Sequence, residues 1–597
     1  MIERARGGVL LLCLAAACAQ TTPPPKTAAS TAPGAAVAAP AKPAVNVGPP
    51  VTLLPAATAR PFQLATVSIG SIDRLLENGV KLIGSAVPLP MTAKDVRDKL
   101  LADAGLAPEV AANLDLSSPA GAAVVALDDK GRTGLVMAIP TRGPAEADKL
   151  IAGLGKPVMT SGPLTMIANG AGKSQGWVYR AGSVVVLGDE VDGMARGVML
   201  ALEARRAGPD DVTTTIYPEA IAKAHGTDVK SAIAAFLEQM KQAQAAANPL
   251  LATDNSISEM MGAMLGLVGD ADPIEIGLSA DPARGLLLRA RLDARPGSAL
   301  ANLAKDVRPF EIDPVVLGGS GKAAMIGGLS VGPFWRQMFD QIKTRLAADK
   351  GKGAPAALAY YQAYLNALDG QSSGTVTIDK AAPYFTGAFS TPLKDAAGAA
   401  KVGAALGKLD AAAMSALMRA QMAGAAGMFD WKATRETVGK AKAMHFRVTV
   451  KKDSLFDTEV VRRWFGSGFD VYQAVAGTRV VVTGGREAKA RLIAIASGKK
   501  VTPVKDASFA AAESAAKGRD GFYYFDLAPV VGLVGSTSGN PMLAAVSHGG
   551  AGPIPLIFTG GGDGAGKVWT ADLTVPTSAF SSIAALFAAA AMSAPAQ

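Results

Sequence analysis

The feature that most constrains the fold of this chain is an internal repeat. Four sequence patterns occur twice, in the same order, and each combines apolar strand residues with a turn or helix-start signal. They are residues 66–70 and 328–332, the paired runs 122–127/135–139 and 375–378/384–389, the paired runs 177–181/184–187 and 471–474/480–483, and the segments from Pro273 to Pro296 and from Pro553 to Pro576. Four matches in one order predict a tandem duplication, with a first unit at residues 61–310 and a second unit at residues 320–597.

Within each predicted unit, β-hairpin signals alternate with signals for single helices. Pro144 and Gly155 stand where a helix begins and ends, and Thr92 with Asp95 has the spacing of a capping box. Short turns make neighbouring strands antiparallel, and we expect the intervening helices to cover one face of the sheet. The predicted fold class is therefore α+β, with two tandem duplicated units of antiparallel sheet covered by helices.

The first 18 residues have the parts of an export signal. Arg4 and Arg6 are basic, and residues 9–17 form an apolar run. This run is much shorter than the ~20 residues that a membrane-spanning helix needs, and its length is typical of a signal peptide. Three alanines, residues 15–17, stand directly before Cys18.

This arrangement resembles the lipobox of bacterial lipoproteins, whose cysteine becomes the first mature residue and carries diacylglycerol. The resemblance implies lipid attachment at Cys18 and a membrane anchor. Because Ala19 rather than aspartate follows, it also implies sorting to the outer membrane, on its periplasmic face or at the cell surface. The alternative is ordinary signal-peptidase cleavage after Ala19. The only other cysteine, Cys13, leaves with the signal peptide, so the mature body has no disulfide and no thiolate metal site.

Residues 19–60 are rich in Ala, Pro and Thr and nearly free of charge. Such a segment buries too little apolar surface to offset the entropy of ordering, so we expect a disordered tether between the anchor and the body.

Composition narrows the function classes. The chain has 597 residues, of which 49% are hydrophobic, enough for two or more well-packed domains. The net charge of +9 is spread thinly, without a run of five basic residues, and this argues against nucleic-acid binding. The Gly-Lys pairs at 172–173 and 566–567 lack the other residues of a P-loop. We therefore expect no nucleotide, no metal and no cofactor.

Ser330 carries the sharpest enzymatic pattern. It lies in GLSVG, residues 328–332, which satisfies the G-x-S-x-G pattern of a hydrolase nucleophile. Its counterpart in the repeat, Ser68, has Thr66 in place of the first glycine. A serine that caps a helix explains both copies, so Ser330 is only a weak catalytic candidate.

Two methionine-rich faces are candidates for an apolar ligand or partner surface, because methionine surfaces adapt to varied ligands. Their alternative role is core packing. The residues are Met260, Met261, Met264 and Leu265 in one predicted helix, and Met414, Met418 and Met422 in a second helix near 411–428 that is peculiar to the second unit.

The sequence thus predicts a non-enzymatic envelope lipoprotein, anchored to the membrane by its N-terminal lipid, that binds a hydrophobic ligand (such as a lipid) or an envelope protein. Two alternatives stay open: a structural or assembly scaffold, and a serine hydrolase of envelope material that uses Ser330.

The anchor can be tested directly. Wild-type protein should begin at Cys18 and carry the mass of diacylglycerol, whereas Cys18→Ser should be a soluble periplasmic species without that mass. Intact-mass analysis of both proteins makes the comparison. A wild-type protein that begins at unmodified Gln20 would contradict the assignment.

Overall fold

The structure is a computed structural model. It describes residues 46–84, 91–103, 106–168, 174–247, 262, 265–305, 308–317, 322–330, 333–379, 381–421, 429–452, 454, 457–497, 509–510, 513–514, 517–537 and 552–593. Their contacts divide the chain into two compact units. The first contains the described residues up to Lys81, those between Leu89 and Asp228, and Glu275–Ala280; the second contains the others.

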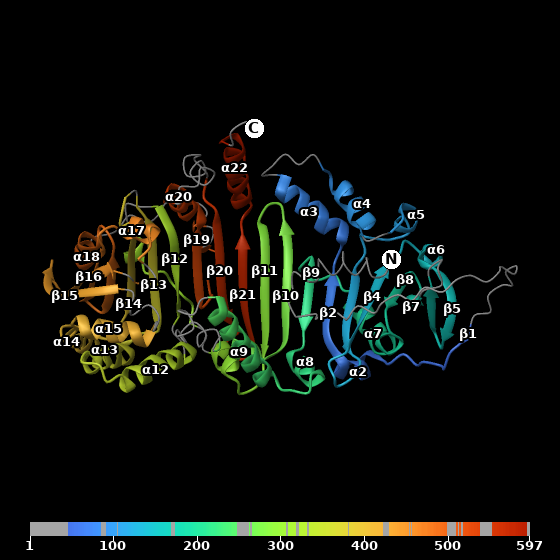
Figure 1. Cartoon of the computed structure of the whole chain (residues 1–597), viewed down its shortest axis with the longest axis horizontal. Coiled ribbons are helices and arrows are strands. Elements are labelled where there is room, and N and C mark those ends of the chain that lie inside the picture. The colour runs from blue at the N-terminus through green and yellow to red at the C-terminus, as the bar shows by residue number, and fades with distance from the viewer. Residues whose placement is uncertain are drawn as a thin grey trace. The chain divides into compact units, whose positions relative to one another are not determined.

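The first unit is built on an antiparallel sheet. Its strands are β1 (Asn46–Val47), β2 (Gln63–Ile69), β3 (Ala120–Ala126), β4 (Thr133–Pro140), β5 (Lys156–Ser161), β6 (Leu164–Ala168), β7 (Ser174–Ala181), β8 (Val184–Gly188), β9 (Val212–Ile216) and the part of β10 (Ala271–Asp281) that belongs to this unit. They pair in the order β1-β5-β6-β7-β8-β4-β3-β2-β9-β10, and β1–β5 is a parallel pair. Figure 1 shows β2, β4, β7 and β8 among the blue to teal strands of this sheet.

Helices cover both faces of this sheet. They are α2 (Ala56–Ala59), α3 (Ile72–Gly84), α4 (Ala93–Asp103), α5 (Pro108–Ala111), α6 (Pro144–Leu154), α7 (Val191–Ala204) and α8 (Pro218–Ala224), with a short 3-10 turn at Arg60–Phe62. On β8, Val184 and Val186 pack with α7, whereas Val185 and Leu187 pack with α6. The prediction that helices cover one face is therefore wrong. An uninterrupted apolar strand such as β8 is buried on both sides, and its sequence already has that pattern.

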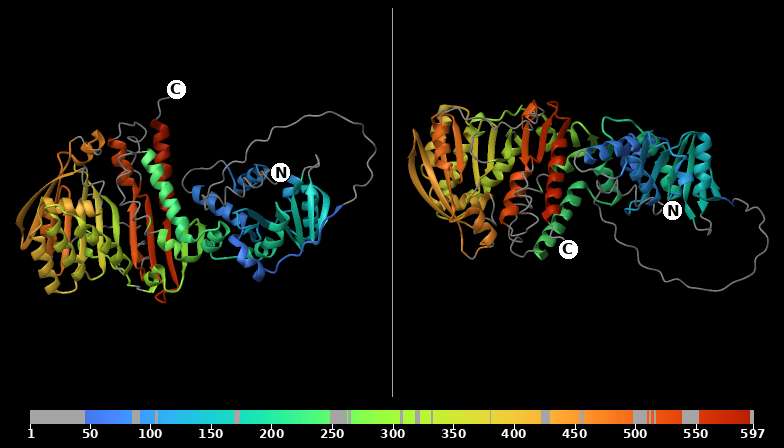
Figure 2. Two further views of the ribbon diagram at one scale, coloured as in Figure 1. Left: turned by 60° about the horizontal axis from the view of Figure 1, so that its bottom comes forward. Right: turned by 90° about the horizontal axis from the view of Figure 1, so that it is seen from above.

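The second unit also has an antiparallel sheet. Its strands are β11 (Gly285–Ala294), β12 (Lys322–Ser330), β13 (Gln371–Ile378), β14 (Phe385–Pro392), β15 (Phe429–Val438), β16 (Ala441–Val450), β17 (Phe469–Ala476), β18 (Arg479–Gly484), β19 (Gly521–Asp526), β20 (Pro555–Gly562) and β21 (Val568–Val575). They pair in the order β11-β21-β20-β19-β12-β13-β14-β18-β17-β16-β15. In Figure 1, β19, β20, β21 and β11 run side by side, and Figure 2 shows the strands from two further directions.

Helices again pack on both faces. They are α9 (Val229–Ala247), α11 (Ala299–Lys305), α12 (Pro333–Ala348), α13 (Ala354–Ala367), α14 (Ala396–Leu406), α15 (Ala411–Gln421), α17 (Glu459–Phe465), α18 (Ala488–Ala496), α20 (Leu527–Thr537) and α22 (Thr577–Ser593), with a 3-10 turn at Pro314–Val316. Met444 and Phe446 of β16 pack with α13, α14 and α15, whereas Ala443, the residue directly before Met444, packs with α18. The predicted α+β fold class is confirmed.

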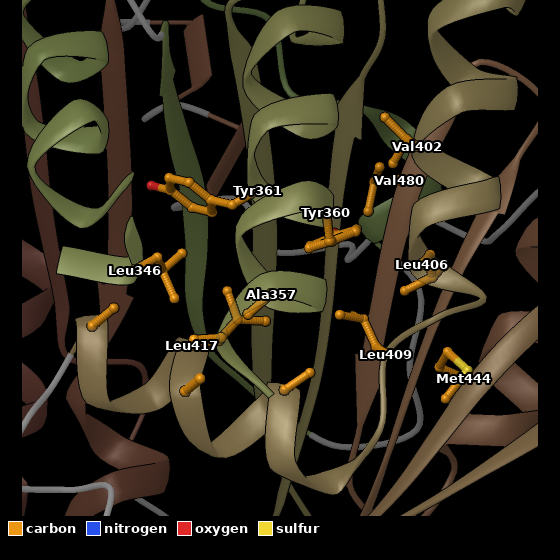
Figure 3. Close-up of a cluster of buried hydrophobic side chains, with 14 of the residues drawn as sticks. Leu346, Ala357, Tyr360, Tyr361, Val402, Leu406, Leu409, Leu417, Met444 and Val480 are labelled. Atoms are coloured by element: carbon orange, nitrogen blue, oxygen red, sulfur yellow. The ribbon is translucent and has the colours of Figure 1, made fainter. Parts of the chain in front are cut away.

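Two adjacent tyrosines of α13 lie in the larger core of this unit (Figure 3). Both are buried, and burial raises the pKa of each phenol. Gln473 Nε2 donates to Tyr360 Oη at 2.5 Å, whereas Tyr361 Oη has no hydrogen-bond partner in the described structure. The Tyr360 hydroxyl thus accepts a hydrogen bond, whereas the hydroxyl of the neighbouring Tyr361 is buried without a partner among the described residues.

Several local predictions are confirmed. The hydroxyl of Thr92 accepts from the backbone N–H of Asp95, and Asp95 in return accepts from the backbone N–H and the hydroxyl of Thr92. Pro144 is the first residue of α6, and Gly155 follows its end.

The boundaries differ from those predicted. Cys18 and most of the predicted tether lie outside the described residues, but its last part packs on the first unit, where Val51, Leu53 and Leu54 contact the core under α7. These three side chains are apolar anchors within an otherwise Ala/Pro-rich segment. The second compact unit includes β11 and α11, which the predicted boundary near 310–320 assigns to the first.

The two tyrosines lead to a prediction about stability. Tyr361→Phe should raise the free energy of unfolding by about 1 kcal/mol, because it removes a buried hydroxyl without a partner. Tyr360→Phe should lower it by about 1–2 kcal/mol, because it leaves the Gln473 amide without its acceptor. Urea unfolding of both variants measures the difference. Equal losses in the two variants would contradict it.

Candidate functional site

A cleft of about 580 Å³ opens in the first unit over strands β2 and β9, and we call it the threonine cleft. Most of its lining residues have polar side chains. They are Arg60, Gln63, Thr66, Ser68, Leu200, Glu203, Ala204, Arg206, Gly208, Pro209, Thr213, Thr215, Tyr217 and Glu275.

Strand register places the hydroxyls on the floor of this cleft. Thr66 is opposite Thr215, and Ser68 is opposite Thr213, in the antiparallel pair β2–β9. Since side chains alternate between faces along a strand, these four lie on one face of the sheet. Thr66 is also opposite Ala123 of β3, which packs in the core under α7. The four hydroxyls therefore share the face that α7 covers.

The cleft lies beyond the C-terminal end of α7. The apolar residues Val198 and Ala201 of this helix pack in the core, and the helix ends at Ala204. The following residues 205–211 read RRAGPDD, and a Gly-Pro pair cannot continue a helix. The helix thus covers part of the sheet face and leaves the polar end of β2 and β9 open.

Three floor hydroxyls have no partner within the described structure: those of Thr66, Thr213 and Thr215. All three side chains are half-buried. Ser68 differs, because its hydroxyl donates to the backbone carbonyl of Arg206 at 2.7 Å. Half-buried hydroxyls that lack partners leave hydrogen-bonding capacity available to a ligand.

The charges around the cleft balance. Arg60 lies 3.9 Å from Glu203 in a solvent-exposed ion pair. Arg206 is exposed and Glu275 is half-buried, and neither forms an ion pair with another described residue. Two guanidinium groups and two carboxylates sum to zero, so the cleft has no strong preference for a charged ligand.

The first unit has a second pocket of about 530 Å³, in which polar side chains contact one another. Arg97 contacts Asp73 at 3.4 Å and Asp98 at 3.3 Å. Ser117 and Ser118 each donate to Asp115 at 2.6 Å, and these hydrogen bonds hold the pKa of its carboxyl below the usual value. Because these polar groups already have partners, the threonine cleft is the stronger candidate for a binding site.

Ser330 lies at the end of β12 and is buried. Its hydroxyl donates to the backbone carbonyl of Arg308 at 2.8 Å. Of the three histidines that could activate it, His225 caps the end of α8, His445 contacts carboxylates on β15 and β17, and His548 lies outside the described residues. No described contact joins Ser330 to a histidine.

The predicted methionine surfaces are described in part. Met260, Met261, Met264 and Met422 lie outside the described residues. Met414 of α15 packs against the core of the second unit, and Leu265 and Met418 are half-buried. The binding role of the two faces therefore stays a prediction.

Sequence reasoning missed a charged cluster on the second unit. His445 Nδ1 lies 3.0 Å from Glu436 Oε1, and its Nε2 lies 2.8 Å from Asp470 Oδ1. Lys489 Nζ lies 2.6 Å from Glu436 and holds the pKa of that carboxyl below the usual value. Arg447 contacts Asp470 at 3.0 Å. These groups satisfy one another, and among the described residues no group of His, Cys, Asp or Glu is arranged to hold a metal ion.

The threonine cleft was also missed, although Thr66, Ser68 and Glu275 lie in segments of the predicted repeat. One available signal was the run VTTTI at residues 212–216, a strand with hydroxyls on both faces. Arg60 and Glu275 are distant from this run in the sequence, and only the tertiary structure brings them to the same cleft.

Comparison with known proteins finds no matching family model, no similar curated protein and no similar solved structure. None of the helices in the described part of the chain combines the length and apolar character needed to cross a membrane.

The environment of Ser330 leads to a prediction. Ser330→Ala should leave esterase and peptidase activity unchanged at background, because the hydroxyl proton is held by a backbone carbonyl. It should lower the free energy of unfolding by about 1 kcal/mol, since a buried hydrogen bond is lost. Activity assays and urea unfolding test the two parts. Stoichiometric labelling of Ser330 by a fluorophosphonate probe would overturn the first part.

Proposed function

We propose that this protein is a non-enzymatic lipoprotein of the bacterial envelope, anchored to the outer membrane through Cys18, that binds a ligand in the threonine cleft. The observation that carries the proposal is the row of half-buried hydroxyls at Thr66, Thr213 and Thr215, which have no partner among the residues that the structure describes. Polar groups in this state are stabilised when a ligand or ordered water supplies the missing hydrogen bonds.

We also propose that the chain is a tandem duplication. Support comes from the order of strand pairing in its two halves. In the first half, the order is β5-β6-β7-β8-β4-β3-β2-β9-β10. In the second half, the order is β15-β16-β17-β18-β14-β13-β12-β19-β20. Adding ten to each strand number of the first series produces the second.

Matching backbone hydrogen bonds add to this support. Three bonds of the first half have counterparts between equivalent strands of the second: Gly70 N to Asp211 O (2.9 Å) with Ser330 N to Asp520 O (2.7 Å), Asp115 N to Pro140 O (3.0 Å) with Asp369 N to Pro392 O (3.1 Å), and Thr141 N to Ser183 O (2.8 Å) with Leu393 N to Thr478 O (2.8 Å). The equivalent pairs β2–β3 and β12–β13 also share a register shift, which follows Gln63 in β2 and Ala323 in β12. Such bulges are retained features of related sheets.

Within the proposed duplication, these hydrogen bonds favour a different correspondence from the one that the sequence predicts. They align Ser330 with Gly70, so that Ser68 aligns with Gly328, two residues from the predicted partner. The same alignment relates the four floor positions of the cleft to apolar or small residues: Thr66 to Ile326, Ser68 to Gly328, Thr213 to Phe522 and Thr215 to Tyr524.

In the second half this position is a closed apolar core. Ile326, Phe522 and Tyr524 are almost fully buried and pack with Phe310 and Phe509. A Cβ atom on Gly328 would lie 2.7 Å from Phe310 Cζ, so the aromatic ring occupies the space beside this glycine. The contrast favours the first half as the ligand-binding copy and the second as the structural copy.

The hydrogen bond from Ser330 to Arg308 supports a non-enzymatic role over the alternative of a Ser330 hydrolase. The polar floor of the cleft argues for a ligand with hydrogen-bonding groups, which differs from the hydrophobic ligand predicted for the methionine faces.

The proposal is tested by blocking the cleft. Thr213→Phe introduces the side chain found at the corresponding position of the second half, where it fills this space. The ligand that co-purifies with detergent-extracted wild-type protein, identified by native mass spectrometry, should be absent from Thr213→Phe and retained by Thr214→Val on the opposite face. A ligand that remains bound to Thr213→Phe would contradict the proposed site.

The duplication has its own test. In a crystal structure, residues 61–310 and 320–597 should superpose strand on strand, with Gly70 on Ser330. Unrelated strand orders in the two halves would refute the duplication without affecting the cleft.

A further inference from the structure

We infer that the ligand of the threonine cleft is a neutral saccharide. This inference rests on the proposed function, because it names the chemical class of the ligand at that site. Three properties of the cleft carry it: the spacing of its hydroxyls, the balance of its charges, and the apolar residues on its walls.

The floor presents a grid of hydroxyl groups. Residues two apart on a strand lie about 6.8 Å apart, and residues opposite one another on antiparallel strands have Cα atoms about 5.5 Å apart. Thr66, Thr213 and Thr215 occupy three corners of such a grid, and Ser68 occupies the fourth. This spacing is comparable with the width of a sugar ring, whose hydroxyls point outward from its edge. A threonine hydroxyl both donates and accepts, as does each hydroxyl of a sugar.

The charged residues suit the same ligand. A carboxylate such as Glu275 accepts two hydrogen bonds, and a guanidinium group such as that of Arg206 donates several in one plane. Both groups can therefore bridge neighbouring hydroxyls of a sugar. Because Arg60 and Glu203 balance each other as well, the cleft does not concentrate the positive charge that a phosphate or an anionic lipid headgroup requires.

The walls supply apolar contact. Ala204, Pro209 and Tyr217 line the cleft beside the polar floor, whereas the neighbouring Leu200 is buried in the core. One face of a sugar ring carries C–H groups, and such a face packs on apolar and aromatic side chains. A fatty acyl chain would match these walls but would bury the threonine hydroxyls without partners, which is unfavourable. The combination of walls and floor thus favours a saccharide over a lipid chain.

The experiment uses isosteric removal of the hydroxyls. Full-length wild type and the Thr213→Val/Thr215→Val variant are titrated calorimetrically with maltohexaose, cellohexaose and chitohexaose, and with inorganic phosphate and dodecanoate as charged probes. Thr214→Val is the matched control, because it is the same change on the same strand with the side chain on the opposite face. Since the two cleft hydroxyls have no partner within the described part of the chain, the double variant should unfold at a temperature no lower than that of wild type.

We expect at least one neutral oligosaccharide to bind wild type, the double variant to bind it about tenfold or more weakly, and Thr214→Val to bind it as wild type does. If phosphate or dodecanoate binds in the cleft and the oligosaccharides do not, the inference is wrong and the proposed function stands. If no probe binds, or if the Val substitutions leave saccharide affinity unchanged, the inference is also wrong. The proposed function fails separately, when Thr213→Phe retains the co-purified ligand.

Discussion

The pairing of β2 with β9 is the interaction on which the threonine cleft depends. It sets Thr66 beside Thr215 and Ser68 beside Thr213 on one face of the sheet. On the other face, Val67, Ile69 and Val212 pack with Ala122 and Met137. A slip of one residue would exchange the two faces of a strand and expose this apolar cluster to the cleft. The buried cluster on one side of the sheet therefore determines the register that creates a polar floor on the other.

The equivalent face of the sheet is packed differently in the two halves. In the second half, aromatic side chains close the face over β12 and β19, which stabilises that half through burial of apolar surface. In the first half, the corresponding face keeps hydroxyls and charged residues around an open cleft. Leaving this face open forgoes the stability that apolar packing supplies, and such a loss is expected where a surface has a binding role.

Much of the local structure could be predicted from the sequence because its signals are short in range. The capping box at Thr92 and the helix start at Pro144 depend on residues a few positions apart. The hairpins β3–β4 and β17–β18 were likewise predicted by turn residues between apolar runs. The prediction of helices on one face rested on the alternation of hairpins and helices. The unbroken apolar run of β8 is instead the signal of a strand that is buried on both faces.

The candidate site was harder to predict. Its residues range from Arg60 to Glu275 along the chain, and of these only Thr66, Ser68 and Glu275 lie in segments of the predicted repeat. Strand order brings β2 beside β9, and no local signal encodes that neighbour. The cluster of Glu436, His445 and Asp470 lies on three consecutive strands, and its members meet only through the register of these strands, which the sequence analysis did not assign.

Disulfide formation across the cleft floor tests the β2–β9 register directly. In a chain whose two natural cysteines are replaced by serine, Thr66→Cys with Thr215→Cys should form an intramolecular disulfide, because Cα atoms of opposite residues lie within the range of about 4.4–6.8 Å that a disulfide spans. Thr66→Cys with Thr214→Cys should stay reduced, because these two side chains point to opposite faces. Non-reducing electrophoresis and intact-mass analysis of the two variants provide the comparison. If the second pair cross-links as readily as the first, or if neither does, the register and the cleft built on it are wrong.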